Sequence, residues 1–449
     1  MTDNNYNLNT DFFQELGIEA YKIEHTHIEN DRKIVIYARP STNLNTIVSC
    51  PYCGSVSIKR NGFYTRTIKH IKMFNFNTII KLNQCRFLCI DCKKSFNQEC
   101  KLAGKYSHMS NDLKLNILSE CRKKKSFSDI GSELNVSSVS VLNTFKDNIY
   151  TERKPLTRVI CIDEFAADTN AGKYALSIGD PCGGEILDVL KSRKQDFVYY
   201  YFKSLSVEER NNVKYIITDL CEAYRTIVRN LFFNSVHIAD RFHWIKLSTN
   251  AFNLVRIRIM KDYIETCKKT RDIDLKRELS MLAYLMKSNY KAFLANRYNK
   301  EAIYYSEETK HSINGKQLTR QDVIEIVLNS SSELENSYYL LQDLYKISIF
   351  SSYETFDNDI SNWMDNVKEC NIKEFKKVML TYKEWKKEIR NSFIIDEVTG
   401  KRLTNGFIEG KNNICKVIKR NAFGFKDFST LRNKILYSNT KKLLIKNTK

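Results

Sequence analysis

Two carboxylates that each follow an apolar run are the residues of this sequence best placed for chemistry. Residues 159–162 lead into Asp163, and residues 213–218 lead into Asp219. Apolar runs of this length, rich in β-branched residues, are typical of strands covered on both faces of a sheet. Sites in open α/β sheets are built at strand ends and in the loops just beyond them. A single acid there can simply cap the next segment, but two such acids favour a metal site.

A third acid, Glu409, lies in residues 404–420, which have a helical pattern. On a helix, Glu409 shares one face with Asn413, Lys416 and Arg420, and an apolar face adjoins it. A solvated helix with an acid near its N-terminus is the alternative. Three converging carboxylates can hold two divalent cations about 3.5–4 Å apart, which activate the attacking oxygen and stabilise the leaving oxygen of a phosphodiester. Oxygen ligands favour Mg²⁺ or Mn²⁺.

Two CxxC motifs predict a structural Zn²⁺ ion in the N-terminal part of the chain. Zinc takes soft ligands at tetrahedral angles, and each CxxC turn directs two sulfurs at one ion. The gap between the motifs is longer than in the commonest zinc ribbons, and Cys85 or Cys100 could replace one ligand. The four expected ligands are Cys50, Cys53, Cys89 and Cys92.

Residues 125–145 fit a helix-turn-helix, with the turn at Asn135 and with Ser137 as the N-cap of the second helix. Short polar side chains on that helix can reach base edges, and the basic residues 122–125 support contact with DNA. An ordinary helical hairpin is the alternative. The side chains expected to face outward are Ser138, Ser140, Asn143 and Thr144, and those expected to pack inward are Val139, Leu142 and Phe145.

The composition favours a polyanionic partner. The 449 residues carry a formal net charge of +20, and clustered lysine and arginine gain affinity by releasing counterions from phosphates. Nucleic acid is the first interpretation and an acidic membrane surface the second, although the base composition of the source genome can also enrich lysine. Neither a signal peptide nor a membrane-spanning run is evident. An intracellular protein is therefore expected, with its thirteen cysteines serving as metal ligands or core residues rather than disulfides.

The central residues predict a mixed sheet flanked by helices. Strands ending near residues 163, 178 and 190 precede a helix at 197–202 and the strand that leads to Asp219. A helix at 221–233 and a strand at 235–239 complete the order of a ribonuclease H-like fold. In that fold the first and fourth strands are neighbours, so Asp163 and Asp219 are expected to lie close together. The next 150 or so residues have amphipathic helical stripes that predict core packing.

In their order along the chain, these motifs resemble those of the zinc-ribbon insertion-sequence transposases of the ISL3 family, a branch of the DDE transposases. The resemblance implies that Asp163, Asp219 and Glu409 are the catalytic, metal-binding triad. Asp240 and His243 are secondary candidates, which either support the site or cap and pack the next helix. Besides the two CxxC motifs, the resemblance rests on residues 162–165, 218–219, 239–243, 405–410, 416–420 and 423–425.

The implied fold class is multidomain α+β, with an N-terminal zinc ribbon and helix-turn-helix and a ribonuclease H-like α/β catalytic domain interrupted by an all-helical insertion. A weak helix is also expected at residues 12–16. The expected boundaries are 1–105 for the N-terminal region with the ribbon at about 48–97, 106–150 for the helix-turn-helix, 151–245 and 401–449 for the catalytic domain, and 246–400 for the insertion.

By the same resemblance, the zinc ribbon and helix-turn-helix bind double-stranded DNA at terminal inverted repeats. Metal-activated water then cleaves the element ends, and the freed 3′-hydroxyl attacks target DNA. Lys416, Lys419 and Arg420 are expected to contact DNA. A homodimer is expected in the active DNA complex, and the bacterial cytoplasm, in association with the nucleoid, is the expected location. A non-catalytic regulator derived from a transposase and a metal-dependent nuclease on the same fold are the alternatives.

Overall fold

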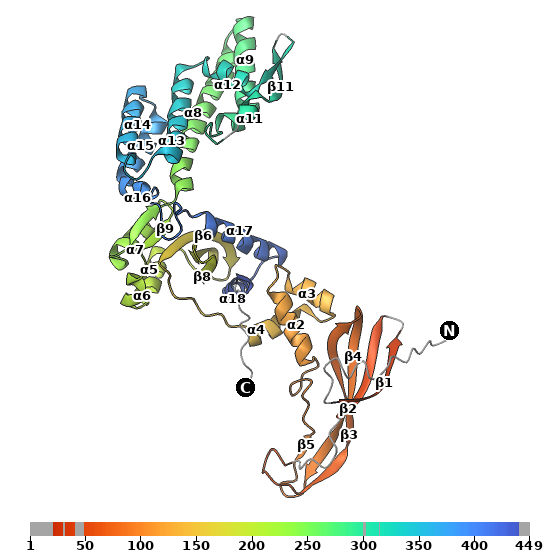
Figure 1. Ribbon diagram of the computed structural model, residues 1–449. Helices are drawn as coiled ribbons and strands as arrows, with labels where there is room; N and C mark the ends of the chain where they lie inside the picture. Colours follow the sequence, from red (N-terminus) through yellow and green to blue (C-terminus); the bar gives the residue numbers. More distant parts are fainter. Residues whose placement is uncertain (1–20, 30–31, 41–48, 300–301, 314, 440–449) are drawn as a thin grey trace. The chain divides into compact units, whose positions relative to one another are not determined.

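The structure is a computed structural model that describes residues 21–29, 32–40, 49–299, 302–313 and 315–439 (Figure 1). These residues form two compact units. The first takes in the described residues up to Glu152, Asp168–Asn170, and the C-terminal part from Cys415. The second consists of Arg153–Ala167 and Ala171–Ile414. The helix expected at residues 12–16 lies outside the described ranges.

The first unit contains a five-stranded sheet in the order β1-β2-β4-β3, with β5 paired to β4. Strands β2 and β4 are parallel, whereas the other pairs are antiparallel. One face is apolar: Ile36, Ile68 and Ile80 are buried there and belong to one core with Leu102. The strands are β1 (Tyr21–Glu29), β2 (Lys33–Pro40), β3 (Ile58–Met73), β4 (Phe76–Cys89) and β5 (Ser95–Asn97).

Four helices of the first unit share a second core. Phe145 and Tyr437 are fully buried in it, with their rings 6.0 Å apart in an edge-on contact. The ammonium group of Lys434 is buried in the same unit and donates to the carbonyl of Cys121 at 2.5 Å and to that of Lys123 at 3.1 Å. The helices are α2 (Asn111–Cys121), α3 (Phe127–Leu134), α4 (Ser138–Asn148) and α18 (Phe428–Asn439).

The second unit is organised around a five-stranded sheet in the order β10-β9-β6-β7-β8. Strands β6, β9 and β10 are parallel, and β7 and β8 form an antiparallel pair. The pairing of β6 with β9 confirms the predicted neighbourhood of the first and fourth strands. The strands are β6 (Val159–Thr169), β7 (Gly172–Asp180), β8 (Glu185–Leu190), β9 (Tyr215–Thr218) and β10 (Val236–Ala239).

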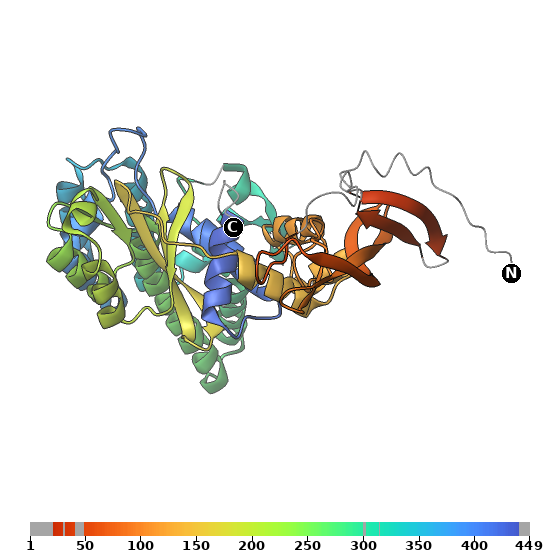
Figure 2. The ribbon, with the colours of Figure 1, turned by 90° about the horizontal axis from the view of Figure 1, so that it is seen from below.

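Both faces of this sheet are covered, as its continuous apolar strands require. On one face, Val198 and Ile227 from two flanking helices pack against Ile160 and Ile216. On the other face, Ile408 joins the core of the sheet. Figures 1 and 2 show the yellow-green helices α5 to α7 beside the strands. The covering helices are α5 (Gln195–Lys203), α6 (Val207–Asn211), α7 (Glu222–Leu231) and α17 (Gly406–Asn421).

The remainder of the second unit is mainly helical, and α8 packs against α9, α13 and α15 (Figure 1). The stripe through Leu334, Tyr338 and Leu341 is buried, as predicted. The expectation of only helices is wrong, because a two-stranded antiparallel hairpin interrupts them, with Gly315 at a φ of 79° in its turn. The elements are α8 (Arg241–Lys269), α9 (Ile273–Ser288), α10 (Tyr290–Phe293), α11 (Ala302–Ser306), β11 (Glu308–Ile313), β12 (Lys316–Thr319), α12 (Arg320–Leu328), α13 (Ser332–Phe350), α14 (Phe356–Cys370), α15 (Lys373–Glu384) and α16 (Lys386–Asn391).

Candidate active site, zinc cluster and helix-turn-helix

The four predicted cysteine ligands converge at the open end of the β3–β4 hairpin, opposite its turn. Their sulfur atoms all lie within 4.8 Å of one another. The Sγ atoms of Cys50 and Cys92 are 3.6 Å apart, and so are those of Cys53 and Cys89. Four sulfurs at about 2.3 Å from a tetrahedral zinc ion lie about 3.8 Å from one another. The cluster therefore fits a structural Zn²⁺ ion.

Neither alternative cysteine belongs to this cluster among the described residues. Cys85 is buried, and its thiol donates to the carbonyl of Arg86 at 3.6 Å. The Cys100 sulfur instead accepts a hydrogen bond from the Tyr21 hydroxyl at 3.6 Å. The geometry thus selects the two CxxC motifs as the ligand set.

Helices α3 and α4 form the predicted helix-turn-helix. Asn135 ends α3 in the left-handed conformation, and the Ser137 hydroxyl caps α4 by accepting from the Ser140 amide at 3.1 Å. A side chain at Gly131 would place its Cβ atom 2.7 Å from the carbonyl oxygen of Val136, which is closer than such atoms approach. The tight turn therefore depends on glycine at this position.

The predicted outer face of α4 is correct for Ser138 and Asn143, which are exposed. Thr144 is wrongly placed in that prediction, because its side chain is buried and donates to the Ser140 carbonyl at 2.8 Å. Ser140 is half-buried, and its hydroxyl lies 2.8 Å from that of Ser137.

The predicted inner face of α4 also needs correction. Val139 was expected to pack inward but is 62 % exposed, whereas Val141 is fully buried. Phe145 is buried as expected, and Leu142 is half-buried. The helix is turned because Val141 and Phe145 pack against α2 and against Tyr437 of α18, a helix too distant in sequence to enter a local prediction.

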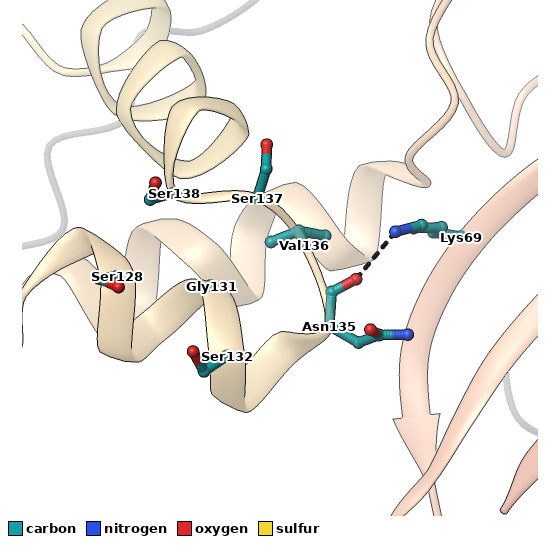
Figure 3. Close-up of a pocket in the computed structure, with 8 residues that line it drawn as sticks. All are labelled: Lys69, Ser128, Gly131, Ser132, Asn135, Val136, Ser137 and Ser138. Atoms are coloured by element: carbon teal, nitrogen blue, oxygen red, sulfur yellow. Dashed lines mark hydrogen bonds between the residues drawn. The ribbon is translucent and has the colours of Figure 1, made fainter. Parts of the chain in front are cut away.

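A polar cavity of about 340 Å³ opens beside the turn of the helix-turn-helix. Figure 3 shows Lys69, from β3, pointing toward the turn, where its ammonium group donates to the Asn135 carbonyl at 3.0 Å. The lining residues are Lys69, Ser128, Gly131, Ser132, Asn135, Val136, Ser137 and Ser138. Hydroxyl groups and one cation thus surround the start of α4.

In the second unit, the strand pairing brings two predicted catalytic acids to the same level of the sheet. Strands β6 and β9 pair in parallel up to Cys161 opposite Ile217. Asp163 and Asp219 each follow that pair by two residues. Burial raises the pKa of the Asp163 carboxyl to about 6, and the neighbouring charge of Asp219 adds to the increase. The two carboxylates are therefore close enough for the charge of one to act on the other.

Asp163 is held from α17 by Asn412, which is not among the site residues predicted from the sequence. The Asn412 amide donates to Asp163 Oδ2 at 2.9 Å, and its carbonyl oxygen accepts from the Ser177 hydroxyl at 2.7 Å. Asn412 is buried, with its neighbours Ile408 and Cys415 on the apolar face of α17. An asparagine within an apolar helical stripe was the available signal.

Asp219 lies in a cluster with both secondary candidates, Asp240 and His243. One ligand atom from each of the three lies within 4.8 Å of the others. His243 Nδ1 is 3.0 Å from Asp240 Oδ2 and 2.8 Å from Asp219 Oδ1. The carboxylate of Asp219, followed by that of Asp240, raises the pKa of His243 to about 10. The imidazole is therefore a cation at neutral pH.

His243 Nδ1 lies between two carboxylates. It forms a hydrogen bond with Asp240 Oδ2 and an ion pair with Asp219 Oδ1. Asp240 is fixed because its Oδ1 accepts from the backbone amide of Asn405 at 3.2 Å. The carboxylate oxygens of Asp219 and Asp240 are ligands of the kind that Mg²⁺ and Mn²⁺ take.

Glu409 lies in the first turn of α17 and is exposed. It is not among the described residues whose ligand atoms lie within 4.8 Å of one another. Asn412, one helical turn further on, connects the same helix to Asp163. The fold thus fixes α17 against the strand of Asp163 while leaving the Glu409 carboxylate accessible.

The other predicted face of α17 is exposed at Asn413, Lys416 and Arg420, as expected. Lys419 is half-buried and forms an ion pair with Asp168, both within the first unit. Contact of these cations with DNA stays a prediction.

Comparison with known proteins places these features in a family. The sequence model of the ISL3 transposases, described as "Transposase", matches residues 160–435, which is more than half of the chain. The chain belongs to the ISL3 family of DDE transposases. A second model, for the zinc finger of the transposases of IS204, IS1001, IS1096 and IS1165, matches residues 48–92. Membership of the DDE transposases implies a phosphoryl-transfer enzyme that uses divalent metal.

Two individual proteins are also similar. The transposase for insertion sequence element IS1001 of Bordetella parapertussis is 19 % identical over 423 residues, covering 92 % of this chain and 93 % of that protein. An ATP-dependent protease of Lactococcus lactis subsp. lactis is 26 % identical over 168 residues, covering 35 % of this chain and 48 % of that protein. The first similarity extends over both units, consistent with the family.

Among the helices of the described residues, none combines the length and the apolar character that a membrane crossing requires.

Proposed function

We propose that this ISL3-family protein binds the terminal inverted repeats of an insertion sequence and catalyses metal-dependent cleavage and transfer of DNA strands. The observation that carries the proposal is the parallel pairing of β6 with β9, which sets Asp163 beside Asp219. The sheet order β10-β9-β6-β7-β8 supports a ribonuclease H-like catalytic domain.

Asp163, Asp219 and Glu409 are the proposed catalytic acids. Their carboxylates suit Mg²⁺ or Mn²⁺, because these cations take oxygen ligands. When bound, such cations activate the attacking oxygen and stabilise the leaving oxygen of a phosphodiester. The exposed Glu409 completes the ligand set from α17, which Asn412 ties to Asp163.

Asp240 and His243 are proposed to position the site. The imidazolium of His243 balances the negative charge of Asp219 and Asp240. These two acids and Asp163 can therefore lie in one region before a metal binds. Asn405 orients Asp240 through its backbone amide, and its side chain donates to the Ile162 carbonyl at 3.4 Å. These contacts join three segments of the second unit at one point.

DNA recognition is assigned to the first unit. The zinc cluster stabilises the end of the β3–β4 hairpin, and α4 presents Ser138 and Asn143 as the exposed polar residues of a recognition helix. Lys416, Lys419 and Arg420 are proposed to contact DNA phosphates. Because the reaction joins two element ends, the proposed active complex with DNA is a homodimer.

The decisive experiment incubates the full chain with a labelled duplex that carries the inverted repeat flanking its own gene. Mg²⁺, Mn²⁺ and chelator are compared, and an Asp219→Asn variant is tested beside an Asp262→Asn control, which changes an exposed acid on α8. Metal-dependent cleavage at the repeat boundary by the wild type and the control, but not by Asp219→Asn, is expected. Specific binding without cleavage by any of these proteins would instead identify a DNA-binding regulator.

A second DNA species in the same reaction separates a transposase from a nuclease. An unlabelled circular plasmid is added as target, and joined products are detected by amplification across the new junction. A transposase yields junctions that begin at the repeat boundary, because the freed 3′-hydroxyl attacks the target. Cleavage without any junctions would contradict the strand-transfer part of the proposal and favour a metal-dependent nuclease.

A further inference from the structure

The loop between α17 and α18 exposes an aromatic ring almost completely. Phe423 is 99 % exposed, and its φ is 54°. A positive φ is unfavourable for a residue with a bulky side chain. An exposed phenyl ring adds the cost of hydrating its apolar surface. Glycine would adopt this φ without strain and would expose no apolar ring. The conformation of the turn therefore does not explain why a phenylalanine stands here.

The backbone around Phe423 is held on both sides. Its amide donates to the Arg420 carbonyl at 3.0 Å, and the amide of Gly424 donates to the Lys419 carbonyl at 2.9 Å. The next residue, Phe425, is buried and meets the Phe127 ring edge-on at 6.1 Å. These contacts lie within the first unit. The ring is therefore presented outward from a fixed turn.

Exposed basic residues belong to the same loop as Phe423 or contact it. Arg420 and Lys426 are exposed on either side of Phe423 along the chain. Lys124 is also exposed, and its carbonyl accepts from the Asn421 side chain at 2.7 Å, which places it at the same loop. Cations that surround an aromatic ring can hold the phosphates of a nucleic acid while a base stacks on the ring.

We infer that Phe423 is a stacking site for an unpaired nucleobase of DNA, with Arg420, Lys426 and Lys124 beside it to hold the adjoining phosphates. The inference rests on the proposed function, because it takes DNA as the ligand. Taking a base out of the stack costs least where that base is already mismatched or unpaired. An element end that must be opened for strand cleavage offers such a base.

The test compares the affinity of the full chain for two duplexes of the same arbitrary sequence, one fully paired and one with a single unpaired 2-aminopurine. Wild type is compared with Phe423→Ala and Phe423→Tyr. The matched control is Phe74→Ala, because Phe74 is 65 % exposed and has a φ of 50° in the β3–β4 turn. Anisotropy reports affinity, and 2-aminopurine fluorescence reports stacking of that base.

Wild type is expected to prefer the duplex with the unpaired base by about 5- to 150-fold, the range that one base–aromatic stack provides. Phe423→Ala loses this preference and the fluorescence change, whereas Phe423→Tyr and Phe74→Ala retain both. No preference in wild type, or an unchanged preference in Phe423→Ala, overturns the inference. These duplexes carry no terminal repeat, so failed cleavage of the element ends refutes the proposed function separately.

Discussion

Replacing Asn412 with alanine tests the connection between α17 and the strand that carries Asp163. In the wild type, the Asn412 side chain bridges the Asp163 carboxylate and the Ser177 hydroxyl at 2.9 and 2.7 Å. Alanine removes both contacts. Ser177 is fully buried, so water cannot replace Asn412 as the hydrogen-bond partner of its hydroxyl. We expect the variant to lose both stability and metal affinity.

The magnitude follows from the two bonds. A hydrogen bond to a carboxylate contributes about 1.5–3 kcal/mol, and a buried hydroxyl left without its partner costs about 1–3 kcal/mol. Together they predict a loss of about 2.5–6 kcal/mol in the free energy of unfolding of the second unit. The amide also lowers the pKa of Asp163, which burial and the charge of Asp219 hold at about 6. Its removal raises that pKa further, so more Asp163 is protonated at pH 7 and Mn²⁺ binds more weakly.

Two assays follow these effects. Denaturant unfolding, monitored by tryptophan fluorescence, measures stability because all three tryptophans lie in the second unit. Calorimetric titration with Mn²⁺ at pH 6, 7 and 8 measures metal affinity in the folded protein. The control is Asn413→Ala, the same chemical change at the exposed neighbouring residue. If Asn412→Ala matches this control in both assays, the assigned role of the bridge is wrong.

Three further predictions concern the first unit. Cys53→Ser is expected to lose bound zinc in a colorimetric zinc assay, whereas Cys100→Ser, outside the cluster, retains it; equal zinc contents would contradict the ligand set. Gly131→Ala is expected to lower stability by about 1–3 kcal/mol, because its Cβ would lie 2.7 Å from a backbone oxygen. The same variant is expected to weaken repeat binding in a mobility-shift assay. Gly104→Ala is the control, because its Cβ meets no atom within 4 Å. Burial lowers the pKa of Lys434 to about 8 in the folded protein, from its ordinary value near 10.5. Between these two values the unfolded chain binds more protons than the folded protein, so stability rises with pH. Denaturant unfolding should show that the free energy of unfolding increases by about 1.3 kcal/mol between pH 7 and pH 9. Lys434→Met should lack this increase. The same pH dependence in both proteins would refute the role of Lys434.

The sequence predicted the elements whose signals are local. The apolar runs before Asp163 and Asp219 correspond to β6 and β9, and their predicted neighbourhood is confirmed by the pairing. The two CxxC motifs converge as expected, because a short turn alone sets the spacing of each cysteine pair. The Ser137 cap of α4 is likewise a contact between residues three apart. Whether the three acids catalyse a reaction stays a prediction.

The errors arose where distant segments decide the outcome. The inner face of α4 is set partly by Tyr437, which lies almost three hundred residues further along the chain. The helical pattern places Asn413 on the exposed face with Glu409, whereas the bridge to Asp163 needs the buried side chain of Asn412. The sequence pattern does not indicate the hairpin of β11 and β12 because its strands are short and polar, although Gly315 lies in its turn.

The contribution of α18 to the first unit has a consequence for how the protein is synthesised. Tyr437 closes the core beneath the helix-turn-helix, and Lys434 binds carbonyls at the end of α2. A ribosome makes α2 to α4 early, but these two side chains emerge only near the end of translation. The helix-turn-helix therefore reaches its final packing after the second unit has been made. A chain that terminates prematurely lacks this closure, so its helix-turn-helix has an incomplete core.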